Sequence, residues 1–244
     1  MQSHSPATTF RIILCRSSHP GNIGAAARAI KNMGLHQLIL VNPLCKVNDE
    51  AYARASGATD ILDQARICNS LEEALADSVE SYAFTSRRRD RIARLLPLRE
   101  AVQDAYQNAI HGKVAFVFGN ETNGLNTEEL SACKTMVYIP ANPDYASLNL
   151  AAAVQLLSYE VYVAQTHIPT INYIQPEAAP AQHHQVVRMI QSFEQVLISS
   201  GYLDPNNPKQ LMPRLQRFFH RARVEEEEVH LLTGIFETIR KKLS

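Results

Sequence analysis

The stretch RIILCRSSHPGNIGAAARAIKNMGLHQLILV, residues 11–41, contains two short apolar runs separated by a helical pattern. The runs at 11–15 and 37–41 predict buried strands. The alanine-rich segment between them predicts a helix that begins near Ile23. Continuously apolar strands joined by a helix are typical of parallel pairing in an α/β sheet. This unit therefore predicts the fold class of the chain.

The same alternation continues to about residue 166. Asn126 and Glu129 form a capping-box pattern at the start of one further helix. We expect one α/β domain over residues 1–166, with a mostly parallel sheet that is covered by helices on both faces. The further strand candidates are residues 65–68, 81–85, 114–118 and 135–139.

The composition changes after this domain. Residues 167–185 contain prolines without a helical period, so they predict a linker. Residues 186–244 carry amphipathic patterns and predict a small all-helical unit. A core formed by only about 60 residues is rarely stable by itself. We therefore expect contacts with the first domain, a dimer mate or a ligand to stabilise this unit.

Clustered charges and histidines in the C-terminal part have simple explanations. Residues 225–228 are glutamates and residues 240–242 are basic, which matches the dipole of one helix. His183 and His184 lie in the predicted linker, where we expect them to be solvated. No cysteine or third histidine lies near them in the sequence, so no metal site is predicted.

The composition limits the classes of function. The chain of 244 residues has no net charge and 45% hydrophobic residues, as is typical of a globular protein. Its four cysteines are far apart, as expected for free thiols of a cytoplasmic protein. The N-terminus lacks a signal-peptide pattern, and the most apolar helix candidate is too polar to cross a bilayer. We therefore expect a cytoplasmic protein without a membrane partner, and local basic patches must bind any nucleic acid.

The loop after the first strand contains a candidate catalytic arginine. Its glycines, Gly21 and Gly24, lack the spacing of a dinucleotide or P-loop fingerprint. Arg28 lies one turn beyond Gly24, which we expect to leave room for a bulky group. A lone arginine on a polar face is often merely solvated. However, Asn22, Gly24 and Arg28 together form the pattern N-x-G-x-x-x-R at a strand-to-helix crossing, where α/β proteins bind ligands.

Two later loops carry more glycines and polar residues than a simple turn requires. VFGNETNGL, residues 117–125, follows a predicted strand, and its two glycines predict backbone amides held close to a ligand. IPANPDYASLNLAAAV, residues 139–154, opens a long helix for which Ser147 is the expected N-cap. Asn149 falls in the apolar first turn, where a buried amide needs partners.

These three motifs, in this order, resemble the SpoU branch of the SPOUT methyltransferases. They are N-x-G-x-x-x-R at 22–28, F-G-x-E-x-x-G-L at 118–125, and I-P followed by S-L-N-L at 139–150. The resemblance covers residues 10–166. It implies an α/β domain with a C-terminal deep trefoil knot, a homodimer, bound S-adenosylmethionine, and methyl transfer to a ribose 2′-OH of RNA. At the positions of Asn120 and Thr122, many SpoU proteins have other residues.

The C-terminal part resembles a narrower group. Residues 211–242 are similar to the helical extension of the tRNA (cytidine/uridine-32)-2′-O-methyltransferases. The resemblance thus implies tRNA as the partner and position 32 of the anticodon loop as the target. A 2′-O-methyltransferase for ribosomal RNA or another tRNA position is the alternative, followed by a knotted RNA-binding protein without catalysis. No DNA partner is expected.

The resemblance also assigns roles to particular residues. It implies a catalytic group of Arg28, Asn22, Glu121 and Asn149. A guanidinium only donates hydrogen bonds and has a pKa above about 12, so we expect Arg28 to hold the phosphate beside the target ribose. Glu121 and Asn149 are expected to support the loops and the arginine. The implied cofactor contacts are Thr85, Ser86, Arg87, Gly119, Ile139, Ala146, Ser147 and Leu148.

Two basic segments predict the surface that binds RNA. Residues 87–99 contain six arginines and one aspartate, and residues 208–223 contain five basic residues and no acid. Phosphate contacts and base stacking fit this composition. A solvated helix face is the alternative, above all for the second segment, where Phe218 and Phe219 fit a core equally well. The expected RNA contacts are Arg88, Arg89, Arg91, Arg217 and Arg221.

Overall fold

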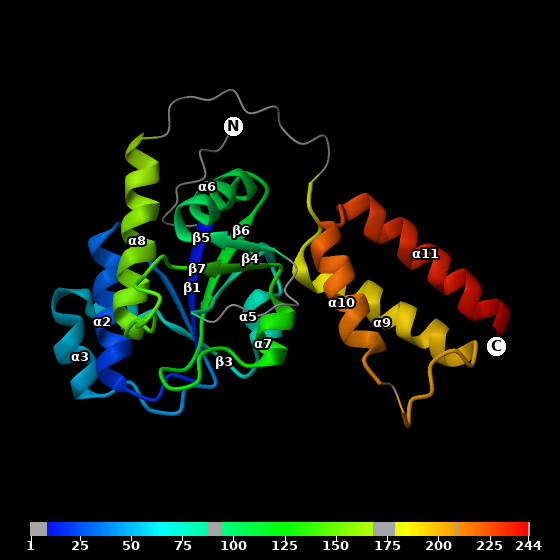
Figure 1. The fold of residues 1–244 in the computed structure, drawn as a ribbon, viewed down its shortest axis with the longest axis horizontal. Helices are drawn as coiled ribbons and strands as arrows, with labels where there is room; N and C mark the ends of the chain where they lie inside the picture. The colour runs from blue at the N-terminus through cyan, green and yellow to red at the C-terminus, as the bar shows by residue number, and fades with distance from the viewer. Residues whose placement is uncertain (1–8, 87–93, 168–178, 208, 244) are drawn as a thin grey trace.

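A parallel β-sheet forms the centre of the N-terminal part of the chain (Figure 1). The computed structural model describes residues 9–86, 94–167, 179–207 and 209–243. Within these residues the sheet has seven strands in the order β3-β2-β1-β6-β4-β7-β5, and every pairing is parallel. The α/β class with a mostly parallel sheet is therefore confirmed. The strands are β1 Phe10–Cys15, β2 Gln37–Val41, β3 Arg66–Cys68, β4 Ser78–Phe84, β5 Leu95–Pro97, β6 Lys113–Phe118 and β7 Thr135–Tyr138.

Six of these strands coincide with the predicted apolar runs, and β5 does not. Its three residues lie inside an arginine-rich segment and end in a proline, so they form no apolar run. β5 pairs with β7 at the edge of the sheet, where a proline is tolerated. β4 begins at Ser78, three residues before the predicted start at 81.

Helices cover both faces of the sheet (Figure 1). α2 and α8 contact each other on one face, together with α3, α4 and α6, while α5 and α7 lie on the other. α2 begins at Pro20 rather than near Ile23, because proline is favoured in a first helical turn. α7 begins with the predicted capping box. The helices are α2 Pro20–Asn32, α3 Asp49–Ala55, α4 Thr59–Asp63, α5 Leu71–Leu75, α6 Leu98–Ala109, α7 Thr127–Ala132 and α8 Leu150–His167, with a 3₁₀ turn at Ser56–Ala58.

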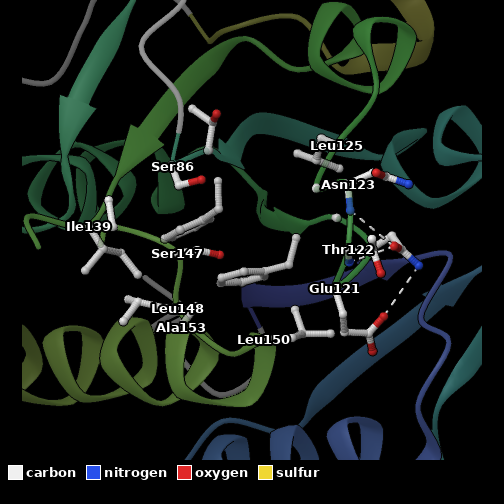
Figure 2. Close-up of a pocket in the computed structure, with 17 residues that line it drawn as sticks. Ser86, Glu121, Thr122, Asn123, Leu125, Ile139, Ser147, Leu148, Leu150 and Ala153 are labelled. Carbon is white, nitrogen blue, oxygen red and sulfur yellow. Dashed lines mark hydrogen bonds between the residues drawn. The ribbon is translucent and has the colours of Figure 1, made fainter. Parts of the chain in front are cut away.

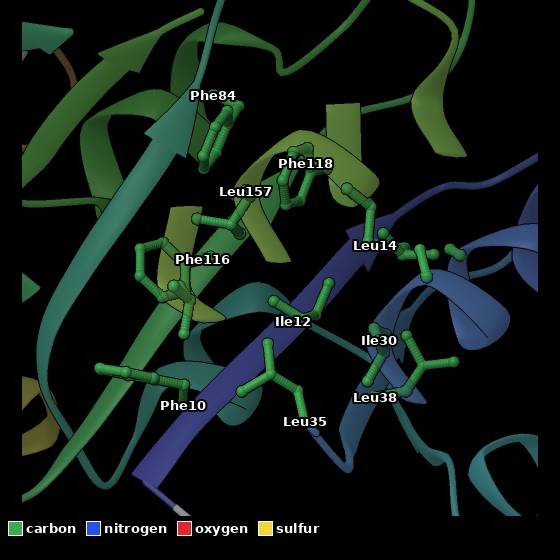
Figure 3. Packing of buried hydrophobic residues seen from close by; sticks show 14 of the residues in the cluster. Phe10, Ile12, Leu14, Ile30, Leu35, Leu38, Phe84, Phe116, Phe118 and Leu157 are labelled. Atoms are coloured by element: carbon green, nitrogen blue, oxygen red, sulfur yellow. The ribbon is translucent and has the colours of Figure 1, made fainter. Parts of the chain in front are cut away.

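Strand β1 shows why the central strands are apolar throughout. Phe10, Ile12 and Leu14 belong to the cluster under α2 and α8, whereas Ile13 and Cys15 belong to the cluster under α5 and α7. Successive side chains of a strand point to opposite faces, so a strand covered on both faces must be apolar at every position. Figure 3 shows the larger cluster, in which aromatic side chains of β6 lie beneath α8.

Two findings follow from the composition of the chain. All four cysteines are free, as predicted, and Cys15, Cys68 and Cys133 are buried. Among the described helices, none is long and apolar enough to cross a membrane.

The last three helices form a smaller unit with a hydrophobic cluster of its own. They are α9 His183–Ser199, α10 Leu211–Ala222 and α11 Glu226–Leu243. α9 contacts α5, and α10 contacts α7 (Figure 1). α11 has an acidic first turn and a basic last turn, as its sequence predicts. We expected this unit to be stabilised by the first domain, a dimer mate or a ligand, and the structure shows contacts with the first domain.

Polar side chains join the two parts in a largely buried layer. Lys134 Nζ donates to the Ala181 carbonyl oxygen at 3.3 Å, and Arg223 donates to both carboxylate oxygens of Asp104 at 3.1 and 2.8 Å. Glu80 is buried close to both cations. Burial raises the pKa of Glu80 and lowers the pKa of Lys134. The charged form of each group therefore depends on its neighbours in this layer.

The prediction that His183 and His184 are solvated linker residues is wrong. α9 begins at His183, so the predicted linker extends into the helix. His184 Nδ1 lies 2.7 Å from the carbonyl oxygen of Ala76. His183 is buried, and its ring stacks on that of His220 with 5.9 Å between the centroids. The proline-rich stretch before the pair conceals the start of the helix, and the stacking partner is distant in the sequence.

Burial keeps the paired rings of His183 and His220 neutral. Within the described parts of the chain, neither nitrogen of His183 has a hydrogen-bond partner, nor does Nδ1 of His220. Desolvation and then the charge of Lys134 lower the pKa of His183 to about 4. Desolvation, His183 and Lys134 lower the pKa of His220 to about 3. Both rings are therefore neutral at pH 7 in the core of the helical unit.

We expect the helical unit to lose stability as the pH falls from about 6.5 to about 4. In this window an unfolded histidine binds a proton that the buried ring does not, so acid favours unfolding. The shift for His183 corresponds to about 3 kcal/mol. Thermal melts from pH 8 to pH 4 should show a shallower decline for His220→Phe than for the wild type or for His230→Phe, which alters an exposed histidine of α11. Equal slopes for all three proteins would contradict the assignment.

Candidate functional site

A pocket lies at the carboxyl ends of β4, β6 and β7 and is closed by the start of α8 (Figure 2). Parallel strands end at the same edge of a sheet, so loops that are distant in the sequence meet there. Arg87, one of the eight predicted cofactor contacts, lies outside the described residues. The structure brings the other seven together around this pocket: Thr85, Ser86, Gly119, Ile139, Ala146, Ser147 and Leu148.

The pocket combines aromatic surface with polar groups. Phe84 and Phe118 line it from neighbouring strands, and their rings stack with 4.1 Å between the centroids. Ser86, Ser147 and Thr122, which are labelled in Figure 2, also line it and supply hydroxyl groups. A site of this kind can hold a flat ring and fix its orientation through a few polar contacts.

The loop after β6 closes on itself. A Cβ on Gly119 would lie 2.1 Å from the carbonyl carbon of Gly124, so only glycine fits there. Gly124 has a φ of 67°, and Asn120 Oδ1 accepts the amide of Thr122 at 2.9 Å. The two glycines were predicted to bring the backbone close to a ligand. The structure adds a second reason for Gly119, which is that the loop crosses its own backbone.

Glu121 joins this loop to the first one. Its Oε2 accepts the amide and the hydroxyl of Ser18 at 3.0 and 2.9 Å, and its Oε1 accepts Asn22 Nδ2 at 3.2 Å and the amide of His19 at 3.4 Å. Burial alone raises the pKa of Glu121, but the hydrogen bonds outweigh it, and the net pKa is lowered. Glu121 is therefore ionised at neutral pH and surrounded by donors.

Asn149 connects the third loop to the same network. Its Nδ2 donates to Asn22 Oδ1 at 3.0 Å, and its Oδ1 accepts the amides of Ala151 and Ala152 in the first turn of α8 at 2.9 and 3.3 Å. Asn149, not Ser147, is thus the N-cap of α8, because the helix begins only at Leu150. Asn149 is also exposed rather than buried. Glu121, Asn22 and Asn149 form a continuous chain of contacts across the three predicted loops.

Arg28 extends from the exposed face of α2. Among the described residues, no hydrogen bond ties it to Asn22, Glu121 or Asn149, and it does not line the pocket. The expectation that Gly24 leaves room for a bulky group is wrong. A Cβ there would lie 2.0 Å from the carbonyl oxygen of Ala51, so Gly24 lets α2 pack closely against α3.

Part of the arginine-rich segment 87–99 is occupied by internal contacts. Arg94 donates to both carboxylate oxygens of Asp104 at 3.0 and 2.9 Å. Arg99 does the same with Glu160 at 3.1 and 3.0 Å. These two arginines therefore add less to an RNA-binding surface than their number in the sequence suggests. The predicted RNA contacts of this segment lie outside the described residues: Arg88, Arg89 and Arg91.

α10 presents basic residues on the side opposite its core. Arg214 and Arg221 are exposed, and Arg217 is half-buried. Phe219 belongs to the core of the helical unit, whereas Phe218 is 53% exposed. The alternative that both rings belong to a core therefore holds for Phe219 alone. Phe218 lies on the same helix face as Arg214 and Arg221, at spacings of four and three residues.

Sequence reasoning missed Ser18 and Arg16. Ser18 supplies two of the donors to Glu121. Arg16 Nη2 lies 3.0 Å from the carbonyl oxygen of Gly124, in the loop after β6. Both residues precede the N-x-G-x-x-x-R motif, and their position at the carboxyl edge of β1 is the only signal in the sequence.

Two family models match the chain. Residues 9–159 match the SpoU rRNA Methylase family. The chain belongs to this SpoU methylase family. Residues 184–244 match the model for the C-terminal domain of the tRNA methyltransferase TrmJ.

One curated relative and one solved structure match nearly the whole of this SpoU-family chain, and a second structure matches two thirds of it. The tRNA (cytidine/uridine-2′-O-)-methyltransferase TrmJ of Pectobacterium atrosepticum is 42% identical over 235 residues, which are 95% of this chain and 97% of that protein. The crystal structure of TrmJ from Z. mobilis ZM4 is 33% identical, with a TM-score of 0.83 over 95% of this chain and 99% of that one. A structure described as giving insights into the 2-OH methylation of C/U34 on tRNA is 26% identical, with a TM-score of 0.54 over 67% of this chain and 100% of that one.

We expect Glu121→Gln to release the first loop. An amide accepts through one atom only, and its NH₂ group would face donors in place of the second oxygen. The loss should reach about 1–3 kcal/mol of unfolding free energy. Hydrogen exchange of the amides at 18–22, together with thermal melts, measures the effect. Glu128→Gln, at an exposed glutamate of α7, is the control. Unchanged exchange at 18–22 in Glu121→Gln would show that the carboxylate does not hold this loop.

Proposed function

We propose that this chain is an S-adenosylmethionine-dependent methyltransferase that modifies the ribose 2′-hydroxyl of a cytidine or uridine at position 32 of tRNA. One observation carries the proposal. Glu121, Asn22 and Asn149 hold the three family loops together beside one pocket. Arg28 extends from the helix that contains Asn22. The arrangement supplies a site for a methyl donor and a cation for RNA, which ribose methylation needs in a fixed relative position.

The residues of the pocket suit S-adenosylmethionine. The largely buried rings of Phe84 and Phe118 give the pocket an apolar wall against which an adenine ring can pack. Polar groups after β4 and just before α8, including the hydroxyls of Ser86 and Ser147, can orient the polar parts of this cofactor. When bound, this cofactor supplies an electrophilic methyl group on a sulfonium.

The residues of the chain orient the ribose and its proton. Arg28 is exposed and outside the pocket, so we assign it to the RNA, where it holds the phosphate beside the target ribose and aligns the 2′-hydroxyl. Glu121 is unsuitable as a general base, because its oxygens already accept four donors and its pKa is lowered. The hydroxyl proton then passes to the RNA phosphate or to water.

Binding of tRNA requires positive surface beyond the pocket. Arg217 and Arg221 of α10, with the exposed ring of Phe218, offer phosphate contacts and a stacking platform. We assign the same role to Arg88, Arg89 and Arg91, which follow the pocket residue Ser86 in the sequence.

Methyl transfer from labelled S-adenosylmethionine to unmodified tRNA tests the proposal. We expect Arg28→Ala to lower kcat about 100-fold or more, because a misplaced reactant costs rates of this order, while cofactor affinity is retained. Lys31→Ala is the control, since Lys31 lies on the same helix and is paired with Asp60. A wild-type protein that binds the cofactor but leaves tRNA unmethylated would overturn the tRNA assignment. Transfer to ribosomal RNA would then support the alternative.

Mapping of the methylated nucleotide separates two related activities. Position 32 is what the C-terminal resemblance implies, and residues 184–244 match the TrmJ C-terminal domain. The 26% identical structure, in contrast, concerns C/U34. A methyl group on nucleotide 34 would contradict position 32 and leave the 2′-O-methyltransferase activity standing.

We also propose that the chain is a cytoplasmic homodimer whose pocket loops belong to a deep trefoil knot. Members of the SpoU branch suggest the knot, and the close crossing of Gly119 and Gly124 is compatible with it. α8 carries Leu156, Tyr159 and Tyr162, which are 40%, 50% and 46% exposed. Large exposed apolar side chains on one helix are typical of an interface, and a second copy of this chain is the partner that we assign to it.

Leu156→Glu combined with Tyr159→Glu should convert the dimer to a monomer. Burial of two carboxylates without partners in an apolar interface is strongly unfavourable, so association should be lost. Sedimentation velocity at micromolar concentration measures the mass. Ile110→Glu, at an exposed apolar residue that follows α6, is the control. A monomeric wild type would refute the dimer.

A further inference from the structure

We propose that Arg16 is a positioning residue that holds the loop after β6 in the shape required to bind the cofactor. The inference rests on the proposed function, because it assigns the pocket to S-adenosylmethionine. Arg16 lies outside the three family motifs and does not line the pocket. It acts through the pocket wall at residues 118–125.

The backbone of Arg16 adopts an unusual conformation at the end of β1. Its φ is 52°, in the left-handed region that a non-glycine residue occupies at a cost of about 1 kcal/mol or more. Its amide continues the sheet by donating to the carbonyl oxygen of Val41 at 2.8 Å. Such a conformation persists only where the surroundings fix it. It turns the chain out of the sheet beside the loop after β6.

Arg16 contacts both ends of that loop. At the start, its carbonyl oxygen accepts Asn120 Nδ2 at 2.7 Å. At the end, its Nη2 donates to the Gly124 carbonyl oxygen at 3.0 Å. The guanidinium also forms a bidentate pair with Glu129, at 2.8 Å from Nε to Oε1 and 2.7 Å from Nη2 to Oε2. One residue therefore fixes the two points between which the pocket wall is held.

The pairing with Glu129 extends this restraint to α7. Glu129 Oε2 also accepts the amide of Asn126 at 2.8 Å, as part of the capping box. The Glu129 side chain is 11% exposed and that of Arg16 is 27% exposed, so water screens this charge-assisted pair less than a surface pair. The planar guanidinium contacts both oxygens of Glu129 through Nε and Nη2 and also donates to Gly124, a geometry that the single nitrogen of a lysine does not reproduce.

The loop needs such a restraint because its own geometry is demanding. Gly119 and Gly124 approach so closely that a Cβ on Gly119 would collide with the backbone of Gly124. Gly124 itself has a φ of 67°. Without the guanidinium, the Gly124 carbonyl and α7 lose their direct connection to β1. Cofactor binding would then have to order the pocket, and the free-energy cost of this ordering would lower the affinity for the cofactor. Methyl transfer takes place after the pocket is ordered, so its rate would change less.

Calorimetric titration of S-adenosylmethionine into the full-length protein tests the inference. Arg16→Gln should weaken cofactor binding about tenfold or more, as expected for the loss of a charge-assisted pair. At saturating cofactor, kcat should stay within about threefold of the wild type, and tRNA affinity should not change. Arg16→Lys should recover part of the affinity. Arg99→Gln is the matched control, since Arg99 also forms a bidentate pair, with Glu160 on α8.

A second variant keeps the test decisive if Arg16→Gln fails to fold. Glu129→Gln retains an acceptor for the capping box and removes the charge that Arg16 contacts, so it should weaken cofactor binding in the same way. The double variant should bind no more weakly than Arg16→Gln, because the pair with Glu129 is already absent in that variant. Wild-type affinity in Arg16→Gln or in Glu129→Gln overturns the inference. A wild-type protein that does not bind S-adenosylmethionine refutes the proposed function instead.

Discussion

The carboxylate of Glu121 is the contact on which the candidate site depends. Four of its donors belong to Ser18, His19 and Asn22, about a hundred residues earlier in the chain. Hydrogen bonds to an ionised acceptor are roughly twice as strong as neutral ones, and Asn22 passes the connection on to Asn149. Without this carboxylate, the loop that precedes Arg28 loses the hydrogen bonds that join Ser18, His19 and Asn22 to the loop after β6.

The parallel sheet makes this convergence possible and also explains where the backbone is strained. All strands end at one edge, so the chain must turn out of the sheet there repeatedly. Arg16 after β1, Asn42 after β2 and Gly124 after β6 have φ values of 52°, 44° and 67°. Asn42 is held by a 2.7 Å hydrogen bond to the Asn69 carbonyl, and Arg16 by its contacts with the β6 loop. Side-chain contacts from neighbouring loops offset the strain at Arg16 and Asn42, whereas Gly124 adopts its positive φ without a steric cost.

The sequence predicted those features that depend on local pattern. Strands buried on both faces are apolar throughout, so the pattern predicted them. The resemblance to the SpoU branch implied the pocket residues, which meet because parallel strands end at one edge of the sheet. Features that depend on contacts with distant segments were not predicted from the sequence. The role of Gly24 depends on how closely α3 approaches α2, and the burial of His183 depends on α10. β5 was not predicted, because an edge strand of three residues needs no apolar run.

Asp104 shows why counts of basic residues overstate an RNA-binding surface. Burial raises the pKa of its carboxyl, but hydrogen bonds from Arg94 and Tyr82 and the charge of Arg223 lower the net pKa. A carboxylate 9% exposed in its side chain needs these cations to remain ionised. Arg94 and Arg223 therefore neutralise one internal charge and fasten the helical unit to the edge of the sheet. The arginines left for RNA are those without such a partner, and among the described residues of α10 they share an exposed face with Phe218.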